Sequence, residues 1–301
     1  MSALFFYYER KEIVAKKKST AFPVAILGAV LGMAMKKKGY LSVAILAFVA
    51  GAAFEYWFMT ELWPKRDQWY SWKFSARNYR EFGEPCDTDQ TLDRKGFSLG
   101  YSYKYKAALW ASYILSSDSV SVDVGRYGTF YADDDIPEQY RLKLKDLTNN
   151  GYDKGHLAPS ASIDFSEDAN RETFALSNVV PQHPKLNRQG WEAVESLERK
   201  WTASKGKLFV TTGPVYGANP QEVNGVPIPA KMYKVIYAYD DERAIAFLMP
   251  NAPVTDKDIW KYAMSVKELE DEIGLNFFSA MPEGTRNRVK DRLELASWKT
   301  K

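Results

Sequence analysis

The sequence is poor in cysteine and histidine. Its 301 residues include one cysteine, Cys86, and two histidines, His156 and His183. A single cysteine excludes a disulfide within the chain, and we expect Cys86 to be structural because no histidine or carboxylate cluster accompanies it. The lack of disulfides favours a reducing compartment without excluding an oxidising one, since a chain of this size can be stable without covalent links.

The sequence also lacks an internal repeat, a glycine-rich phosphate loop and a regular alternation of strands and helices. These absences argue against a fold built on a parallel sheet. Hydrophobic residues make up 46% of the chain and charged residues 26%. This composition excludes a disordered chain and allows one large domain or two modest ones.

Positive charge is concentrated at the N-terminus. Ten of the 41 basic residues and four of the 38 acidic residues precede position 67. The remaining 31 basic and 34 acidic residues give the rest of the chain a net charge of −3, although the whole chain has +3. Proteins that bind nucleic acid by bulk electrostatics show the opposite balance, so any nucleic acid must be held by a local basic groove.

Two apolar runs near the N-terminus, residues 19–35 and 39–60, predict a membrane anchor. The second run has the roughly 20 apolar residues that a transmembrane helix needs, and aromatic residues follow it as at a membrane interface. The pattern allows one transmembrane helix or two. The alternative is that the two runs are buried helices of a protein core. Lysines at 36–38 precede the second run, which favours a C-terminal domain on the periplasmic or extracellular side.

We therefore predict a membrane anchor at 1–62, a juxtamembrane linker at 63–96 and a folded domain at 97–301. In that domain, strand-like runs alternate with helix-like runs. The predicted strands are residues 105–115, 119–124, 171–182, 207–217, 232–241 and 243–251, and the predicted helices are residues 136–147, 186–206 and 258–274. This mixture predicts an α+β fold around a central antiparallel sheet.

The first candidate for chemistry is His156, at the end of the polar turn DKGH at 153–156. Glycine beside the imidazole allows a close backbone approach. A neutral imidazole is the natural base for taking a proton from water. Taken alone, however, a single histidine in a polar loop is more often structural than catalytic.

A second polar cluster, Asn178, Asn187, Glu195 and Arg199, falls on a predicted strand, loop and helix. The amide oxygen of Asn187 suits Mg²⁺, which keeps most of its waters, and a helix N-cap is the alternative role. Helical spacing places Glu195 on nearly the same face two turns later, where it could hold metal-bound water. Glu195 and Arg199 also have the spacing of an ordinary surface ion pair.

Together these motifs resemble the DNA/RNA non-specific endonucleases of the ββα-metal class, which include endonuclease G. The resemblance rests on DKGH at 153–156, SNVVPQ at 177–182, LNRQGW at 186–191 and the helical glutamate, in that order. It covers roughly residues 97–278. It implies a ββα-metal finger on a central antiparallel sheet and a metal-dependent, sequence-non-specific hydrolysis of DNA, RNA or both.

The resemblance also implies a role for each residue. His156 is the general base, and Asn187 is the one direct protein ligand of Mg²⁺, with Mn²⁺ as the alternative. Glu195 orients metal-bound water. Lys154 replaces a family arginine that contacts phosphate, and it keeps the charge without the planar fork, so its contact should be weaker. Arg199 is the arginine near the scissile group, and Arg126 is a looser phosphate contact. Asn178 and Asp153 are structural supports.

Two other functions stay open at this stage. One is a catalytically impaired, membrane-tethered protein of the same fold that binds nucleic acid or a partner, and the other is a phosphodiesterase for small nucleotides. The set of His156, Asn187 and Glu195 favours the nuclease, because binding alone requires none of the three. His183 is expected in a loop, with a substrate contact as the alternative. The choice between DNA and RNA is open, and so is the oligomeric state, for which a homodimer is one option.

Overall fold

The computed structural model describes residues 40–62, 73–74 and 77–299. The chain divides into two compact units, Met1–Pro64 and Lys65–Lys301. In the first unit the described residues form helix α3 (Tyr40–Trp57), which is followed by the π-helical turn η1 (Phe58–Leu62). The shorter apolar run at 19–35 lies outside the described residues.

The predicted transmembrane segment is wrong. In the part of the chain that the structure describes, no helix combines the length and the apolar character needed to cross a bilayer. Helix α3 has 18 residues, about 27 Å of helix against a hydrocarbon core of about 30 Å. Glu55 lies in its last turn, and η1 adds a π-helical turn after it.

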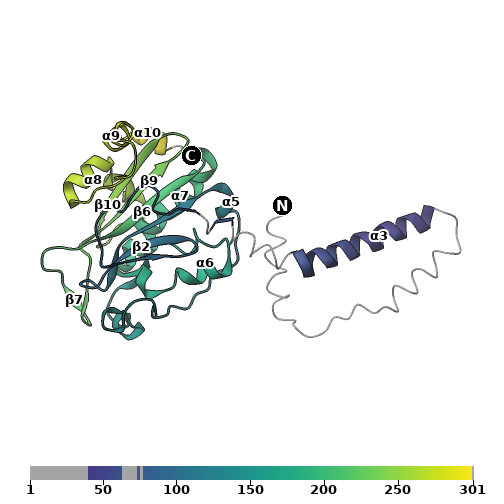
Figure 1. The fold of residues 1–301 in the computed structure, drawn as a ribbon, viewed down its shortest axis with the longest axis horizontal. Helices are drawn as coiled ribbons and strands as arrows, with labels where there is room; N and C mark the ends of the chain where they lie inside the picture. Colours follow the sequence, from purple (N-terminus) through teal and green to yellow (C-terminus); the bar gives the residue numbers. More distant parts are fainter. Residues whose placement is uncertain (1–39, 63–72, 75–76, 300–301) are drawn as a thin grey trace. The chain divides into compact units, whose positions relative to one another are not determined.

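The second unit is built on an antiparallel sheet of seven strands, in the order β1-β2-β3-β6-β9-β10-β11 (Figure 1). The strands are β1 (Gln90–Asp93), β2 (Phe97–Ser102), β3 (Ala107–Leu115), β6 (Leu208–Val215), β9 (Lys231–Ala238), β10 (Arg243–Pro250) and β11 (Ala263–Met264). The central antiparallel sheet is thus as predicted. The sheet begins at Gln90, inside the stretch that the sequence assigned to a linker. The predicted domain limit at residue 97 stays a prediction, and the sheet argues for an earlier start of the domain.

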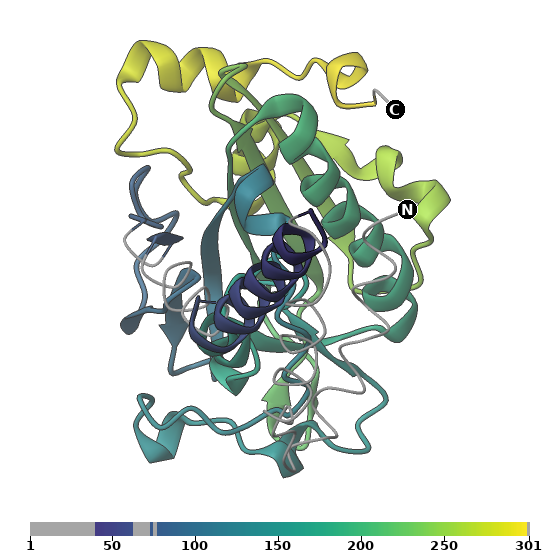
Figure 2. The same ribbon diagram turned by 90° about the vertical axis from the view of Figure 1, so that its right-hand side faces the viewer.

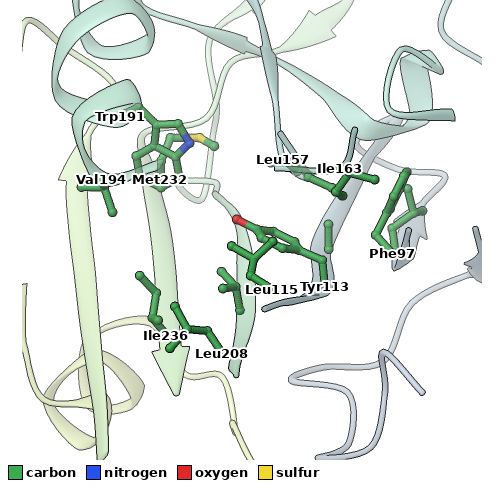
Figure 3. Close-up of a cluster of buried hydrophobic side chains, with 14 of the residues drawn as sticks. Phe97, Tyr113, Leu115, Leu157, Ile163, Trp191, Val194, Leu208, Met232 and Ile236 are labelled. Carbon is green, nitrogen blue, oxygen red and sulfur yellow. The ribbon is translucent and has the colours of Figure 1, made fainter. Parts of the chain in front are cut away.

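Helices cover both faces of this sheet (Figures 1 and 2). Helix α7 (Glu192–Lys205) packs on β3 and β6, while α8 (Val266–Ile273) and α9 (Glu283–Asp291) pack on β10. Because side chains alternate along a strand, Met232 and Ile236 of β9 join the cluster that includes Trp191 on the α7 side (Figure 3). The intervening Tyr233 and Val235 join the cluster on the other side. Both faces are therefore core.

A separate pair of antiparallel strands, β4 (Asp153–His156) and β5 (Val179–Gln182), leads through the π-helical segment η5 (Leu186–Trp191) into α7. The other described elements of this unit are short. They are α5 (Ser117–Val120), η2 (Glu138–Tyr140), η3 (Leu144–Leu147), α6 (Glu167–Glu172), η4 (Leu176–Asn178), β7 (Glu222–Val223), β8 (Val226–Pro227), η6 (Asp256–Tyr262) and α10 (Leu295–Trp298).

Three predicted elements are wrong in whole or in part. The predicted strand at 171–182 is a strand only in β5, because α6 and η4 precede it. Residues 119–124 begin in α5 rather than in a strand, because Ser116 and Ser119 form a reciprocal capping box that favours a helical turn. Residues 136–147 form the two 3₁₀ turns η2 and η3 instead of one helix. Between them the Arg141 guanidinium donates to the carbonyls of Asp134 and Ile136, which closes a loop.

The helices that flank the sheet follow the sequence more closely. Helix α7 ends at Gly206, whose φ of 67° is accessible to glycine at little cost. The predicted helix at 258–274 is divided into η6, β11 and α8. Its predicted stop is correct, since Gly274 closes α8 in the left-handed conformation.

Candidate active site

The strand pair β4–β5 positions the DKGH segment. Its register pairs Gly155 with Val180 and His156 with Val179. A Cβ atom at Gly155 would lie 2.2 Å from Gln182 Oε1 and 2.6 Å from Gln182 Cβ. The close approach of the two strands therefore requires glycine beside the histidine, as the sequence suggested.

Asn178 fixes the turn that follows His156. Its side chain is fully buried, and its amide donates to the carbonyls of Ala158 and Thr173 at 2.9 Å each while its oxygen accepts from the Ala158 N–H at 2.9 Å. Its backbone carbonyl accepts from the Leu157 N–H at 3.0 Å. All these bonds go to backbone, so Asn178 supports the strand pair and offers little to a ligand.

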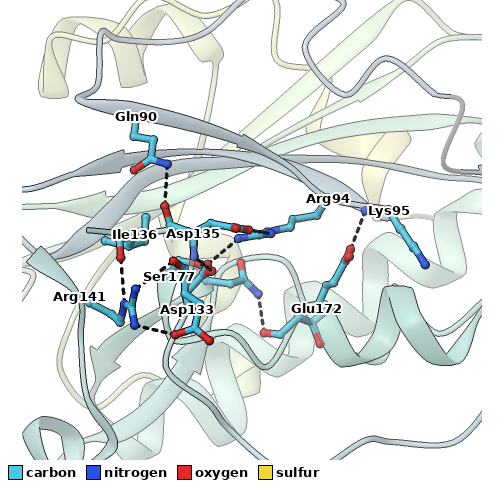
Figure 4. A network of polar contacts seen from close by, with 12 residues as sticks. Gln90, Arg94, Lys95, Asp133, Asp135, Ile136, Arg141, Glu172 and Ser177 are labelled. Atoms are coloured by element: carbon cyan, nitrogen blue, oxygen red, sulfur yellow. Dashed lines mark hydrogen bonds and ion pairs between the residues drawn. The ribbon is translucent and has the colours of Figure 1, made fainter. Parts of the chain in front are cut away.

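A polar network holds η4, and with it β5, against the β1–β2 turn (Figure 4). Arg94 donates to the buried Asp133 at 2.6 Å and to Asp135 at 2.5 Å. Ser177, which precedes Asn178, also donates to Asp133. These residues are far apart in sequence, and sequence analysis did not identify them as supports of the site.

The imidazole of His156 lies between two aromatic rings. Its ring centroid is 5.1 Å from that of Phe130 and 5.0 Å from that of Phe174. The residue keeps partial exposure, but Nε2 is buried and has no hydrogen-bond partner among the described residues. Burial, and then the positive charge of Arg126, lowers the pKa of His156 to about 3. The imidazole is therefore neutral at physiological pH, with one ring nitrogen unprotonated.

Two cations gather around the same aromatic rings. Lys154 Nζ lies 5.7 Å from the centroid of Phe130, and Arg126 Cζ lies 5.1 Å from the centroid of Phe174. Both contacts fall within the range of cation–π interactions. Because both rings also contact His156, the imidazole has two positive charges in its surroundings, which suits a phosphate substrate.

Asn187 lies within η5 and is not a helix cap. The cap positions of η5 and α7 are Lys185 and Trp191, and neither makes a side-chain capping bond. The Asn187 amide instead donates to Asp153 Oδ2 at 2.9 Å through its nitrogen, which leaves Oδ1 out of this bond. The structure thus contradicts the capping alternative and leaves the amide oxygen available.

Asp153 orients that amide. Arg188 clamps its carboxylate from the other side, with Nε at 2.8 Å and Nη2 at 2.6 Å from the two oxygens. Burial raises the pKa of Asp153, but the hydrogen bonds from Arg188 and Asn187 outweigh it, and the net pKa is lowered. Asp153 and His156 are the first and last residues of β4. The point at which Asn187 contacts β4 is therefore roughly 10 Å along the strand from His156.

Glu195 and Arg199 lie on α7, but they do not form the surface ion pair that was the alternative. Arg199 Nη2 lies 3.7 Å from Glu192, and its guanidinium donates to Ser162 Oγ at 3.3 Å and Ser196 Oγ at 3.1 Å. Burial raises the pKa of Glu195 to about 7, against the opposing charges of Lys234 and Arg199. Glu195 is therefore poised to change its charge near neutral pH.

Beneath these residues lies a polar cluster that sequence analysis missed. Glu198 and Lys234 form an ion pair of 3.0 Å, and both side chains have 0% exposure. Two signals point to it in retrospect. Lys234 interrupts the apolar run of β9, and Glu198 falls at helical spacing with Val194 and Trp201, on the apolar side of α7.

The described residues contain no cluster of three or more histidine, cysteine or carboxylate side chains suited to a metal. A site built from one amide oxygen fits Mg²⁺, because this ion keeps several waters and needs few protein ligands. His183 is a turn residue: its N–H donates to Asn251 at 2.7 Å and its Nδ1 accepts from the Lys185 N–H at 3.1 Å. These bonds fit the expected loop role.

Known proteins resemble this chain in sequence and in fold. The family model for DNA/RNA non-specific endonuclease matches residues 57–284. The mitochondrial nuclease 1 of Schizosaccharomyces pombe is 30% identical over 239 residues, which cover 72% of this chain and 74% of that protein. Human mitochondrial endonuclease G is 29% identical over 205 residues, covering 62% and 69%. A chain from the crystal structure of the EndoG/EndoGI complex has the same fold, with a TM-score of 0.63 at 24% identity over 69% of this chain and 92% of that chain.

The fold and these relatives define a metal-dependent nuclease. More specifically, the chain belongs to the DNA/RNA non-specific endonuclease family, as the order of its motifs predicted. Its class of substrate is accordingly nucleic acid.

The predicted membrane location, with the domain on the periplasmic or extracellular side, is wrong. Relatives from Schizosaccharomyces pombe, Saccharomyces cerevisiae and Danio rerio are named mitochondrial nucleases. The described residues contain no helix able to span a bilayer. Neither finding shows the lipid bilayer that was predicted as a partner.

Proposed function

We propose that this nuclease hydrolyses the phosphodiester backbone of DNA, RNA or both without regard to sequence, with His156 as general base. The observation that carries the proposal is the neutral imidazole of His156, whose buried Nε2 has no partner among the described residues and whose aromatic neighbours hold Lys154 and Arg126. Such a group can take a proton from water beside a bound phosphate. Contacts from cations to phosphate give no sequence preference.

The other residues follow from their positions. Asn187, held by Asp153, would bind Mg²⁺ or Mn²⁺ through its amide oxygen, and the ion when bound supplies positive charge to stabilise the charge that develops on the phosphate. Glu195 would orient water near that site, and Arg199 would contact the scissile group. Asn178 keeps the strand pair in place. A homodimer and the predicted domain limits stay predictions.

Nicking of supercoiled plasmid tests the proposal. The wild-type chain should nick DNA with Mg²⁺ and not with EDTA, and His156→Ala should lower kcat by about 10²–10⁴, the usual contribution of a general base. His183→Ala is the matched control, because His183 makes turn contacts only, and it should cut at the wild-type rate.

Three results would contradict the proposal. Full activity of His156→Ala would exclude its role as base. A wild-type chain that binds plasmid without nicking it would favour the catalytically impaired alternative, and cleavage of a chromogenic phosphodiester without cleavage of DNA would favour a small-molecule phosphodiesterase.

A further inference from the structure

The buried ion pair of Lys234 and Glu198 makes further contacts with neighbouring side chains. Lys234 Nζ donates to the Tyr113 hydroxyl at 2.8 Å, and that hydroxyl donates to the Glu198 carboxylate at 2.9 Å. The ammonium also lies 5.3 Å from the ring centroid of Trp191, at the start of α7. A buried ion pair gains little stability over apolar packing, so stability alone does not explain why it lies in the core of this domain.

The pair is connected to the candidate site through one hydroxyl. Ser162 Oγ donates to Glu198 Oε1 at 3.1 Å and accepts from Arg199 Nη1 at 3.3 Å. Ser162 is itself buried, with 1% exposure. Because Glu198 can only accept, it fixes the direction of the Ser162 hydroxyl and leaves the serine lone pairs to the guanidinium.

We propose that Lys234 and Glu198 are positioning residues, which hold the Arg199 guanidinium through Ser162 and anchor the face of α7 that contains Glu195. The proposal rests on the proposed function, since it assigns these residues to the support of that site. Neither residue touches substrate; each acts through Arg199 or Glu195.

The charges around Glu195 support this assignment. Lys234 of β9 acts on the Glu195 carboxyl from the sheet. The other charges that act on it lie on α7 itself, namely Glu192, Glu198 and Arg199, and Glu195 in turn acts on the Tyr113 hydroxyl of β3. After burial, Lys234 is the strongest of these influences, and it lowers the pKa of Glu195. Lys234 therefore favours the charged form of Glu195 in addition to holding Glu198.

The variant Ser162→Ala tests the connection without breaking the ion pair. It should lower kcat for plasmid nicking by about tenfold to a hundredfold, the effect of a slightly misplaced catalytic group. The KM for plasmid should change less than about twofold, because phosphate binding by Lys154 and Arg126 is intact. Ser162→Thr keeps the hydroxyl and should recover most of the lost rate if the added methyl group is accommodated, which its melting temperature will show.

The double variant Lys234→Met with Glu198→Gln removes both charges together and avoids an uncompensated buried charge. It should lower kcat to the same degree as Ser162→Ala. Its matched control is Lys290→Met, which breaks the pair of Lys290 with Glu270 at 2.7 Å on the other side of the sheet. That variant should lose stability and keep the wild-type kcat at a temperature where it is folded.

The proposal is overturned if Ser162→Ala and the double variant are folded and cut at the wild-type rate. It is also overturned if Lys290→Met lowers kcat equally, since the effect would then follow stability alone. Failure of the proposed function looks different, because in that case the wild-type chain itself does not nick DNA, or His156→Ala retains its activity.

Discussion

The two sides of the central sheet each contain a buried lysine–glutamate pair, and the two pairs have different surroundings. On the α8–α9 side, Lys290 binds Glu270 and Asn276, and Glu270 accepts from the Phe277 N–H at 2.6 Å. These contacts join neighbouring segments and secure the end of α8. On the α7 side, by contrast, Lys234 and Glu198 connect a central strand to the helix that contains Glu195 and Arg199.

The comparison extends to how polar groups find partners in each region. On the α8 side a capping box of Ser265 and Glu268 and the left-handed Gly274 satisfy the ends of the helix. Near the start of α7, the Nε2 atom of His156 and the amide of Gln182 are buried without partners among the described residues. Buried polar atoms of this kind are rare in native proteins and require an explanation. For His156, the proposed role as general base supplies one.

The largest contrast is expected when each lysine is replaced by methionine. Lys234→Met leaves Glu198 as an isolated charge at 0% exposure, which should cost about 3–5 kcal/mol in the free energy of unfolding. Lys290→Met should cost about 1–3 kcal/mol, because its partner side chain is 11% exposed and reaches water. Urea unfolding at pH 7 measures both. Equal losses would show that the two pairs have the same role.

A second contrast concerns pH. The pKa of His156 is about 3 in the folded chain, while an unfolded histidine has its ordinary value of 6.5. Between these values the unfolded state holds the proton and the folded state does not, so folding stability is lost as pH falls from about 6.5 to 3. His156→Phe removes this loss and keeps an aromatic ring between Phe130 and Phe174.

Urea unfolding at pH 7 and pH 4.5 checks this expectation. The stability of the wild-type chain relative to His156→Phe should fall by about 2 kcal/mol between the two pH values. A constant difference would mean that the imidazole of His156 has its ordinary pKa in the folded chain. Its pocket would then hold water or accommodate the protonated imidazole.

The sequence predicted the parts of this structure that depend on local patterns. Alternation and helical spacing located β3, β6, β9, β10 and α7, since each has a continuous apolar face. The DKGH motif and the LNRQGW segment pointed to His156 and Asn187 through their resemblance to the endonuclease family, and the roles of these two residues stay predictions. The segment at 119–124 was missed because two serines that cap a helical turn outweigh its β-rich composition.

The supports of the site could not be predicted, because they depend on which strands are neighbours. Lys234 reaches Glu198 only because β9 lies beside β6 in the sheet, under α7. Arg94 and Asp133 meet across 39 residues for a comparable reason. The apolar run at 39–60 shows the opposite error, in which composition alone predicted a membrane span.

A third contrast involves glycine on the two sides. Gly155→Ala should destabilise the chain by about 1–2 kcal/mol, the cost of an overpacked site, because its Cβ would overlap Gln182. Gly284→Ala in α9 has nothing within 4 Å of the new Cβ and should stabilise by up to about 1 kcal/mol. Thermal unfolding and nicking rates compare the two. If Gly284→Ala lost activity, or if Gly155→Ala lost none, the spacing of β4 and β5 would not be what supports the site.

The smallest expected effect is a gain at Lys154, where this chain departs from the family arginine. Lysine offers a point charge, whereas arginine offers two parallel donors to a phosphate. Lys154→Arg should therefore raise kcat/KM for plasmid by up to about tenfold, the value of one further charge-assisted hydrogen bond. Lys231→Arg is the control, since Lys231 pairs with Glu272 of α8 at 2.6 Å, on the other side of the sheet, and should leave the rate unchanged. A lower rate in Lys154→Arg would mean that the contact of Lys154 with Phe130, and the space beside His156 that it preserves, matter more than a second donor to phosphate.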